Sequence, residues 1–129
     1  TLRARQRVTD SMWFGFDVER TQRTDKYLGY NDYTRDSFAF EFKWSPGYRF
    51  DLEAHGAYHL YDFPNAFAFH EPAAGRKTQE TAEGGIVASF LMTRNLSLFA
   101  EARVRESVSN DIRIQYDRTQ YLFGVRWEQ

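Results

Sequence analysis

Large apolar side chains alternate with polar ones over most of this chain. Between positions 37 and 61 the sequence reads SFAFEFKWSPGYRFDLEAHGAYHLY, with a bulky apolar residue at nearly every second position on either side of Ser-Pro-Gly. A period of two is the spacing of side chains on one face of a β-strand. The alternation therefore predicts strands, and almost no helical period is present along the chain.

The same alternation predicts six full strands and one partial strand in an antiparallel up-and-down meander. The expected strands cover residues 2–8 (partial), 12–22, 36–44, 48–61, 79–92, 96–107 and about 115–128. Long polar connections are expected at 23–35, at 62–78 and around Ser109–Asp111, and tight turns at 45–47 and 93–95. Short turns on one side and long loops on the other are typical of outer-membrane barrels. A soluble antiparallel meander can have the same difference in loop length, so this feature alone does not distinguish the two.

Sorting each strand by parity separates an apolar face from a charged face. The apolar face carries no charge across its central span, whereas the other face mixes both signs. The residues expected to face lipid or form an aromatic girdle are Phe38, Phe40, Phe42, Trp44, Tyr48, Phe50, Tyr121, Phe123 and Trp127. The residues expected to line a polar lumen are Glu41, Lys43, Arg49, Asp51, Glu53, Glu101, Arg103, Arg105 and Arg126.

Three features favour a barrel whose apolar face is outside. The expected strands are longer than the ~5–6 residues of soluble strands and reach the ~9–11 that a tilted membrane strand needs. So many Phe and Trp side chains would overpack a small closed barrel, whereas lipid sets no such limit. Aromatic rings gather at strand ends, at Trp44, Tyr48 and Trp127 beside the short turns and at Tyr58 and Tyr121 towards the long loops, as in an interfacial girdle.

These features together predict an all-β chain, an antiparallel up-and-down meander forming part of a transmembrane β-barrel in an outer membrane. The smallest such barrels have about eight strands, and lipid does not tolerate open sheet edges. We therefore interpret residues 1–129 as a single β-barrel segment, a fragment of a larger barrel. Its expected partners are membrane lipid and the remaining barrel strands or other chains of an outer-membrane complex.

The composition of the chain argues against several other classes of protein. A net charge of -1 argues against a general nucleic-acid binder. The chain has no cysteine, which excludes disulfides and thiolate chemistry. No apolar run approaches the ~20 residues of a membrane-spanning helix. None of this conflicts with a barrel that crosses a membrane with strands.

Parts of the second half of the chain resemble the C-terminal barrels of Gram-negative outer-membrane proteins. One stretch is Asp62–Phe69 (DFPNAFAF), expected in a loop, and another runs from Ser109-Asn110 through Tyr116-Asp117-Arg118 into the closing strand. The segment Tyr121–Trp127 (YLFGVRW) is similar to the C-terminal signal that the barrel-insertion machinery reads. The resemblance implies a porin-like transport role at the cell surface, as in barrels for surface assembly or polysaccharide export.

No enzyme activity, metal site or cofactor is expected. His55 and His59 share a face, but four residues along a strand separate them by ~13 Å, too far to bind one metal ion. Carboxylates on the charged face could pair as in a hydrolase. The neighbouring Lys and Arg side chains favour instead a cross-strand charge ladder that lines a wet lumen.

The sequence leaves three functions open. The leading hypothesis is a pore or export channel for hydrated solutes or polysaccharide, with electrostatic lining by the lumen residues. The second is a structural outer-membrane scaffold that anchors partner proteins and whose lumen is plugged. The third is a soluble ligand-binding β-barrel with its apolar face inside, which would stay monodisperse without detergent.

Overall fold

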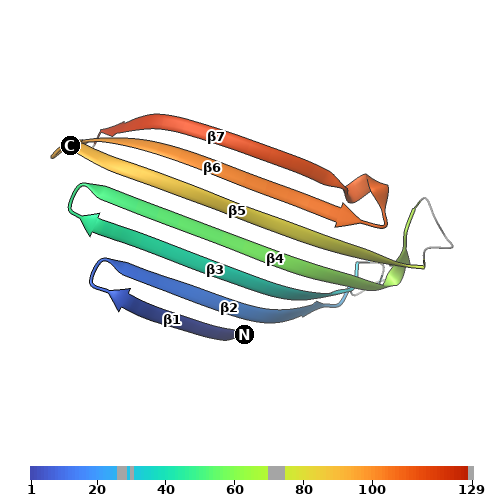
Figure 1. Ribbon diagram of the computed structural model, residues 1–129. Helices are drawn as coiled ribbons and strands as arrows, with labels where there is room; N and C mark the ends of the chain where they lie inside the picture. The colour runs from blue at the N-terminus through green and yellow to red at the C-terminus, as the bar shows by residue number, and fades with distance from the viewer. Residues whose placement is uncertain (26–28, 30, 70–74, 128–129) are drawn as a thin grey trace.

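The computed structural model describes residues 1–25, 29, 31–69 and 75–127, and it shows one antiparallel sheet of seven strands (Figure 1). The strands are β1 (Leu2–Thr9), β2 (Met12–Arg23), β3 (Tyr33–Gly47), β4 (Phe50–Phe67), β5 (Arg76–Thr93), β6 (Leu96–Ser109) and β7 (Tyr116–Trp127). They follow one another across the sheet in chain order, so the predicted all-β meander is confirmed. The sheet is not closed, because β1 and β7 form its two edges.

The connections differ at the two ends of the sheet. Pairs of residues, Asp10-Ser11, Tyr48-Arg49 and Arg94-Asn95, join the strands at one end. Longer segments join them at the other end, and the last of these contains a 3-10 helix, η2 (Ile112–Ile114). Figure 1 shows the tight turns together on one side and the long connections together on the opposite side.

The predicted turn at Ser45-Pro46-Gly47 is wrong in position. Strand β3 continues to Gly47, which pairs with Phe50, and the register shifts between Trp44 and Gly47. A proline has no N–H to donate to the ladder, so an irregular step in the register is a natural place for Pro46. The turn itself is therefore the pair Tyr48-Arg49.

The predicted long loop at 62–78 is also wrong over most of its length. Strand β4 runs on to Phe67 and β5 begins at Arg76, and these two residues pair. The irregularity between Asp62 and Phe67 takes up Pro64. Aromatic contacts hold this extension, because the Tyr61 and Phe63 rings stack with centroids 6.2 Å apart. The stretch DFPNAFAF is thus largely strand.

Cross-strand register fixes which side chains share a face, because directly paired residues point the same way. One row joins Phe14, Phe42, Ala54, Ile86, Ala102 and Tyr121 through successive pairs. A neighbouring row joins Trp13, Lys43, Glu53, Val87, Glu101 and Leu122 on the opposite face. The sheet therefore has one apolar face and one charged face, as the parity of the sequence predicts.

The sheet lacks the hydrophobic core of a folded soluble domain. Ala68 is the only buried apolar residue in the described part of the chain. Large side chains of the apolar face are exposed instead, with 52% of Phe40 and 75% of Phe123 accessible. The buried side chains are polar, and Ser37, Thr81 and Ser107 lie in one row of the charged face. The burial pattern is the inverse of that expected for a soluble sandwich.

Aromatic rings cover glycines of neighbouring strands on both faces. The Phe40 ring lies over its cross-strand partner Gly56 on the apolar face. On the charged face the Phe99 ring lies over Gly124, at 2.6 Å from the place where a side chain would begin. These glycines are sites of close strand contact, as expected for glycine within a strand.

Candidate functional site

The charged face carries a ladder of opposite charges. Lys43 Nζ lies 2.5 Å from Glu53 Oε1, directly across the β3–β4 pair. Arg105 Nε lies 3.4 Å from Glu83 Oε2 across the β5–β6 pair. Arg103 pairs with Glu101 of its own strand. Such pairs each stabilise an exposed sheet only slightly, so their main effect is to set the local charge of the face.

The structure gathers the predicted lumen residues on this charged face, with one exception. The residues on the face are Glu41, Lys43, Asp51, Glu53, Glu101, Arg103, Arg105 and Arg126. Arg49 lies outside the strands, in the two-residue turn, with its guanidinium 5.2 Å from the centre of the Tyr48 ring. The shifted turn explains the difference, because Tyr48 and Arg49 no longer belong to the alternation of β4.

The predicted lipid-facing residues likewise share the apolar face, except for Tyr48 in the turn. They are Phe38, Phe40, Phe42, Trp44, Phe50, Tyr121, Phe123 and Trp127. Trp44 and Phe50 meet edge to face beside the short turns, with ring centroids 5.9 Å apart. Trp127 and Tyr48 lie at the same end and are exposed. Aromatic rings therefore mark this edge of the apolar face.

The apolar face is a band that ends before the strands do. Just beyond Val18 and Phe38 the same face carries Arg20 and Asp36, whose side chains pair at 2.6 Å. On β4 the band runs from Phe50 to Tyr58, whose hydroxyl donates to Glu80; the next residue of this face, Leu60, lies in the charged row of Asp36 and Glu80. Eight residue steps span ~26 Å along a strand. In the sequence this limit is marked by polar residues at positions that belong to the apolar face. The limit was not predicted from the sequence, because the prediction used only the alternation of apolar and polar residues.

The turn end of the band shifts regularly from one hairpin to the next. The apolar-face residues beside the three tight turns are Met12, Phe50 and Met92. Met12 pairs with Trp44, which pairs with Leu52, so Met12 and Leu52 lie at the same height on the sheet. Phe50 therefore lies two residues closer to the turn end than Met12 does. Phe50 pairs with Phe90, so Met92 lies two residues closer to the turn end than Phe50 does. An offset of two residues per two strand spacings means that the strands are tilted by roughly 35° from the normal to the line of turns.

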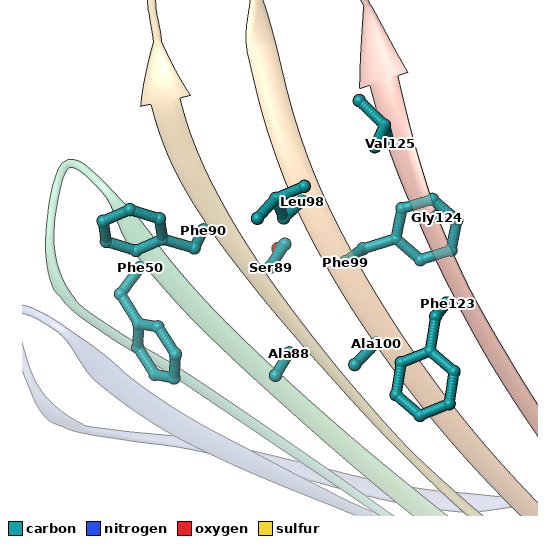
Figure 2. A pocket seen from close by; sticks show the side chains of 10 residues that line it. All are labelled: Phe50, Ala88, Ser89, Phe90, Leu98, Phe99, Ala100, Phe123, Gly124 and Val125. Atoms are coloured by element: carbon teal, nitrogen blue, oxygen red, sulfur yellow. The ribbon is translucent and has the colours of Figure 1, made fainter.

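A shallow apolar hollow of about 580 Å³ lies within the band (Figure 2). Its centre is formed by the small side chains Ala88 and Ala100, which are paired across β5 and β6. Figure 2 shows the Phe50 and Phe90 rings on one side of these alanines and the Phe123 ring on the other. The hollow is lined almost entirely by hydrocarbon and opens outward from the sheet.

An aromatic cluster that the sequence pattern did not predict lies at the long-connection end of the charged face. The Tyr33 ring meets Tyr61 and Phe63, with centroids 5.5 and 5.8 Å away. Lys77 Nζ lies 4.6 Å from the centre of the Phe63 ring, close enough for a cation–π contact. The alternation does place Tyr61 and Phe63 on one face, but their meeting with Tyr33 depends on the β3–β4 register.

The segment between β6 and β7 is fastened by Asp111, which is fully buried. The Arg113 guanidinium donates to both Asp111 carboxylate oxygens, at 2.9 and 2.6 Å, and holds the pKa of Asp111 well below its usual range. The Arg113 guanidinium also lies 4.1 Å from the centre of the Phe69 ring. Asn110 accepts from the backbone N–H of Thr78 at 2.9 Å. The last connection is thus bound to the start of β5.

Acidification is expected to loosen this segment. The pKa of Asp111 is lower in the folded chain than its unfolded value of about 3.9, so its stabilising effect is complete above that pH. The effect declines as the pH falls from about 4 towards the folded pKa. Hydrogen-exchange protection of the Arg113 backbone N–H, which donates to Asp111 at 3.1 Å, should decline over this interval. An Asp111→Asn variant with the same pH profile would contradict this assignment.

Neither a metal cluster nor a membrane helix is present in the part of the chain that the structure describes. Within residues 1–25, 29, 31–69 and 75–127, no three His, Cys, Asp or Glu side chains gather to hold a metal ion. The same residues contain no helix long and apolar enough to cross a membrane. Comparisons with protein-family models, with curated proteins and with solved structures find no match for the chain. The fold and its two faces alone define the class: an all-β protein built as an open antiparallel meander.

Proposed function

We infer that this chain is a wall segment of an outer-membrane β-barrel, with the apolar band in lipid and the charged face towards a polar lumen. The observation that carries the proposal is the exposed apolar band on a sheet without a hydrophobic core. An apolar surface of this extent is a liability in water and is the normal outer surface in a bilayer. The hollow at Ala88 and Ala100 then accommodates lipid acyl chains.

The geometry of the strands also fits a barrel. A tilt of roughly 35° falls at the lower end of the 35–45° found in membrane barrels. At this tilt the ~26 Å of β4 within the band spans roughly 21 Å along the membrane normal, close to the ~25 Å band of such barrels. The two edges β1 and β7 must be paired in lipid. Further strands, from the same protein or from other chains, therefore complete the barrel.

Within this class, a pore or export channel for hydrated solutes or polysaccharide is the leading function. The charged face offers ionised groups of both signs, which suits a water-filled lumen. The pairing of Lys43 with Glu53 and of Arg105 with Glu83 favours the second candidate, a structural scaffold, because paired charges lower the field in the lumen. Conductance across a planar bilayer is expected for the channel and not for the scaffold.

Vesicle flotation tests the membrane assignment. The chain, refolded from urea in the presence of phosphatidylcholine vesicles, should float with the lipid in a density gradient and resist extraction by carbonate. Without lipid or detergent it should aggregate, because the apolar band would be in water. A monodisperse protein in detergent-free buffer that stays at the bottom of the gradient would overturn the proposal and favour a soluble β-protein.

A further inference from the structure

A polar hollow of about 400 Å³ lies on the charged face between β5, β6 and β7. Three arginines line it, Arg103, Arg105 and Arg118, together with His55 and Glu83. Gly84 contributes only backbone to its wall, because its position belongs to the apolar face. The volume is within the range of small-molecule sites.

The charge of this hollow is not balanced by the side chains around it. Arg105 is paired with Glu83, and Arg103 is paired with Glu101. Arg118 has no ion-pair partner among residues 1–25, 29, 31–69 and 75–127. Glu83 and Glu101 therefore compensate two of the three guanidinium charges and leave one without compensation.

Arg105 and Arg118 are moreover directly opposite each other in the β6–β7 ladder. Directly opposed side chains of a sheet have Cβ atoms ~5 Å apart, and two like charges in these positions repel. An anion between them would remove the repulsion. Guanidinium groups are suited to this, because their forked N–H donors match the oxygens of a carboxylate or a phosphate.

We propose that this hollow is a binding site for an oxyanion, a phosphate or carboxylate group on a solute, held between Arg105 and Arg118 with Arg103 beside them. The site requires only that the charged face is in water. It therefore goes beyond the proposed membrane function and does not depend on where the apolar band lies.

The test is a titration of the full chain, refolded in micelles of an uncharged detergent, with inorganic phosphate at constant ionic strength. NMR signals of the arginine Nε–H groups report binding at single side chains. Saturable shifts at Arg105 and Arg118 are expected. Acetate serves as the second probe: tighter binding of phosphate than of acetate assigns a phosphate-bearing ligand, and the reverse order assigns a carboxylate.

Two variants separate a site from a diffuse positive field. Arg118→Gln should weaken phosphate binding by about tenfold or more, because it removes charge-assisted hydrogen bonds. Arg126→Gln is the matched control, since it removes the same charge from the same strand and face and should leave the affinity unchanged. Arg118→Lys, which keeps the charge without the fork, should give an intermediate loss and covers the case in which Arg118→Gln does not fold.

The proposal is overturned if the arginine signals move in proportion to phosphate concentration without saturating. It is equally overturned if Arg126→Gln weakens binding as much as Arg118→Gln. A chain that binds phosphate at Arg118 but does not float with vesicles would keep this site and reject the membrane function, so the two failures are distinguishable.

Discussion

Replacing Ile86 by arginine is expected to lower the free energy of unfolding in lipid vesicles by about 2–4 kcal/mol. Ile86 lies in the middle of the apolar band and is 46% exposed, so the cost cannot come from a protein core. It comes from placing a guanidinium in hydrocarbon. The measurement is urea unfolding in short-chain phosphatidylcholine vesicles, followed by tryptophan fluorescence.

Val108→Arg is the matched control for this experiment. Val108 is 53% exposed, is β-branched like Ile86, and lies on the same face beyond the band, opposite Glu80. A charge outside the hydrocarbon should cost only about 0–1 kcal/mol. If both variants change the stability by the same small amount, as at an ordinary water-exposed surface, the apolar face is not in lipid.

The stability of the folded chain is expected to depend on bilayer thickness, with the largest value in thin bilayers. The band on β4 spans roughly 21 Å along the membrane normal, whereas an ordinary hydrocarbon core is ~30 Å thick. Mismatch costs fractions of a kcal/mol per Å, so the loss between a matched and an ordinary bilayer should total a few kcal/mol. Unfolding in vesicles of increasing acyl-chain length measures the trend.

A lengthened band provides the check on this second prediction. Arg20 and Asp36 form the ion pair that ends the band on β2 and β3. Arg20→Leu with Asp36→Leu extends the apolar face by one row on β2 and β3 and should move the best thickness upward. A stability that does not vary with acyl-chain length in either form would contradict the assignment of the band to the hydrocarbon core.

Local alternation was sufficient to predict the number of strands, their order and the two faces. Each depends on a period of two that side chains such as Phe38, Phe40 and Phe42 display directly. The positions of turns were less predictable, because proline and glycine can be accommodated in an irregular strand as well as in a turn. Pro46 and Pro64 both lie at register shifts inside strands.

The features that the sequence did not predict depend on register between strands. The stagger of the turns and the opposition of Arg105 to Arg118 both require knowing which residue pairs with which. A period of two gives the face of a residue but not its height on the sheet. The sequence therefore predicted Arg103 and Arg105 as separate lumen residues, but it predicted neither the hollow between them nor the part that Arg118 plays in it.

Chain-order pairing also determines how this sheet can assemble. Each strand pairs only with its neighbour in the chain, so every hairpin closes a short loop at a small cost in chain entropy. Contacts of this kind favour stepwise growth from any hairpin, as in repeat proteins. In the proposed barrel, joining β1 to β7 through added strands is the one step that brings together distant parts of the chain. Closure of the proposed barrel is therefore expected to be the slow, late event in folding.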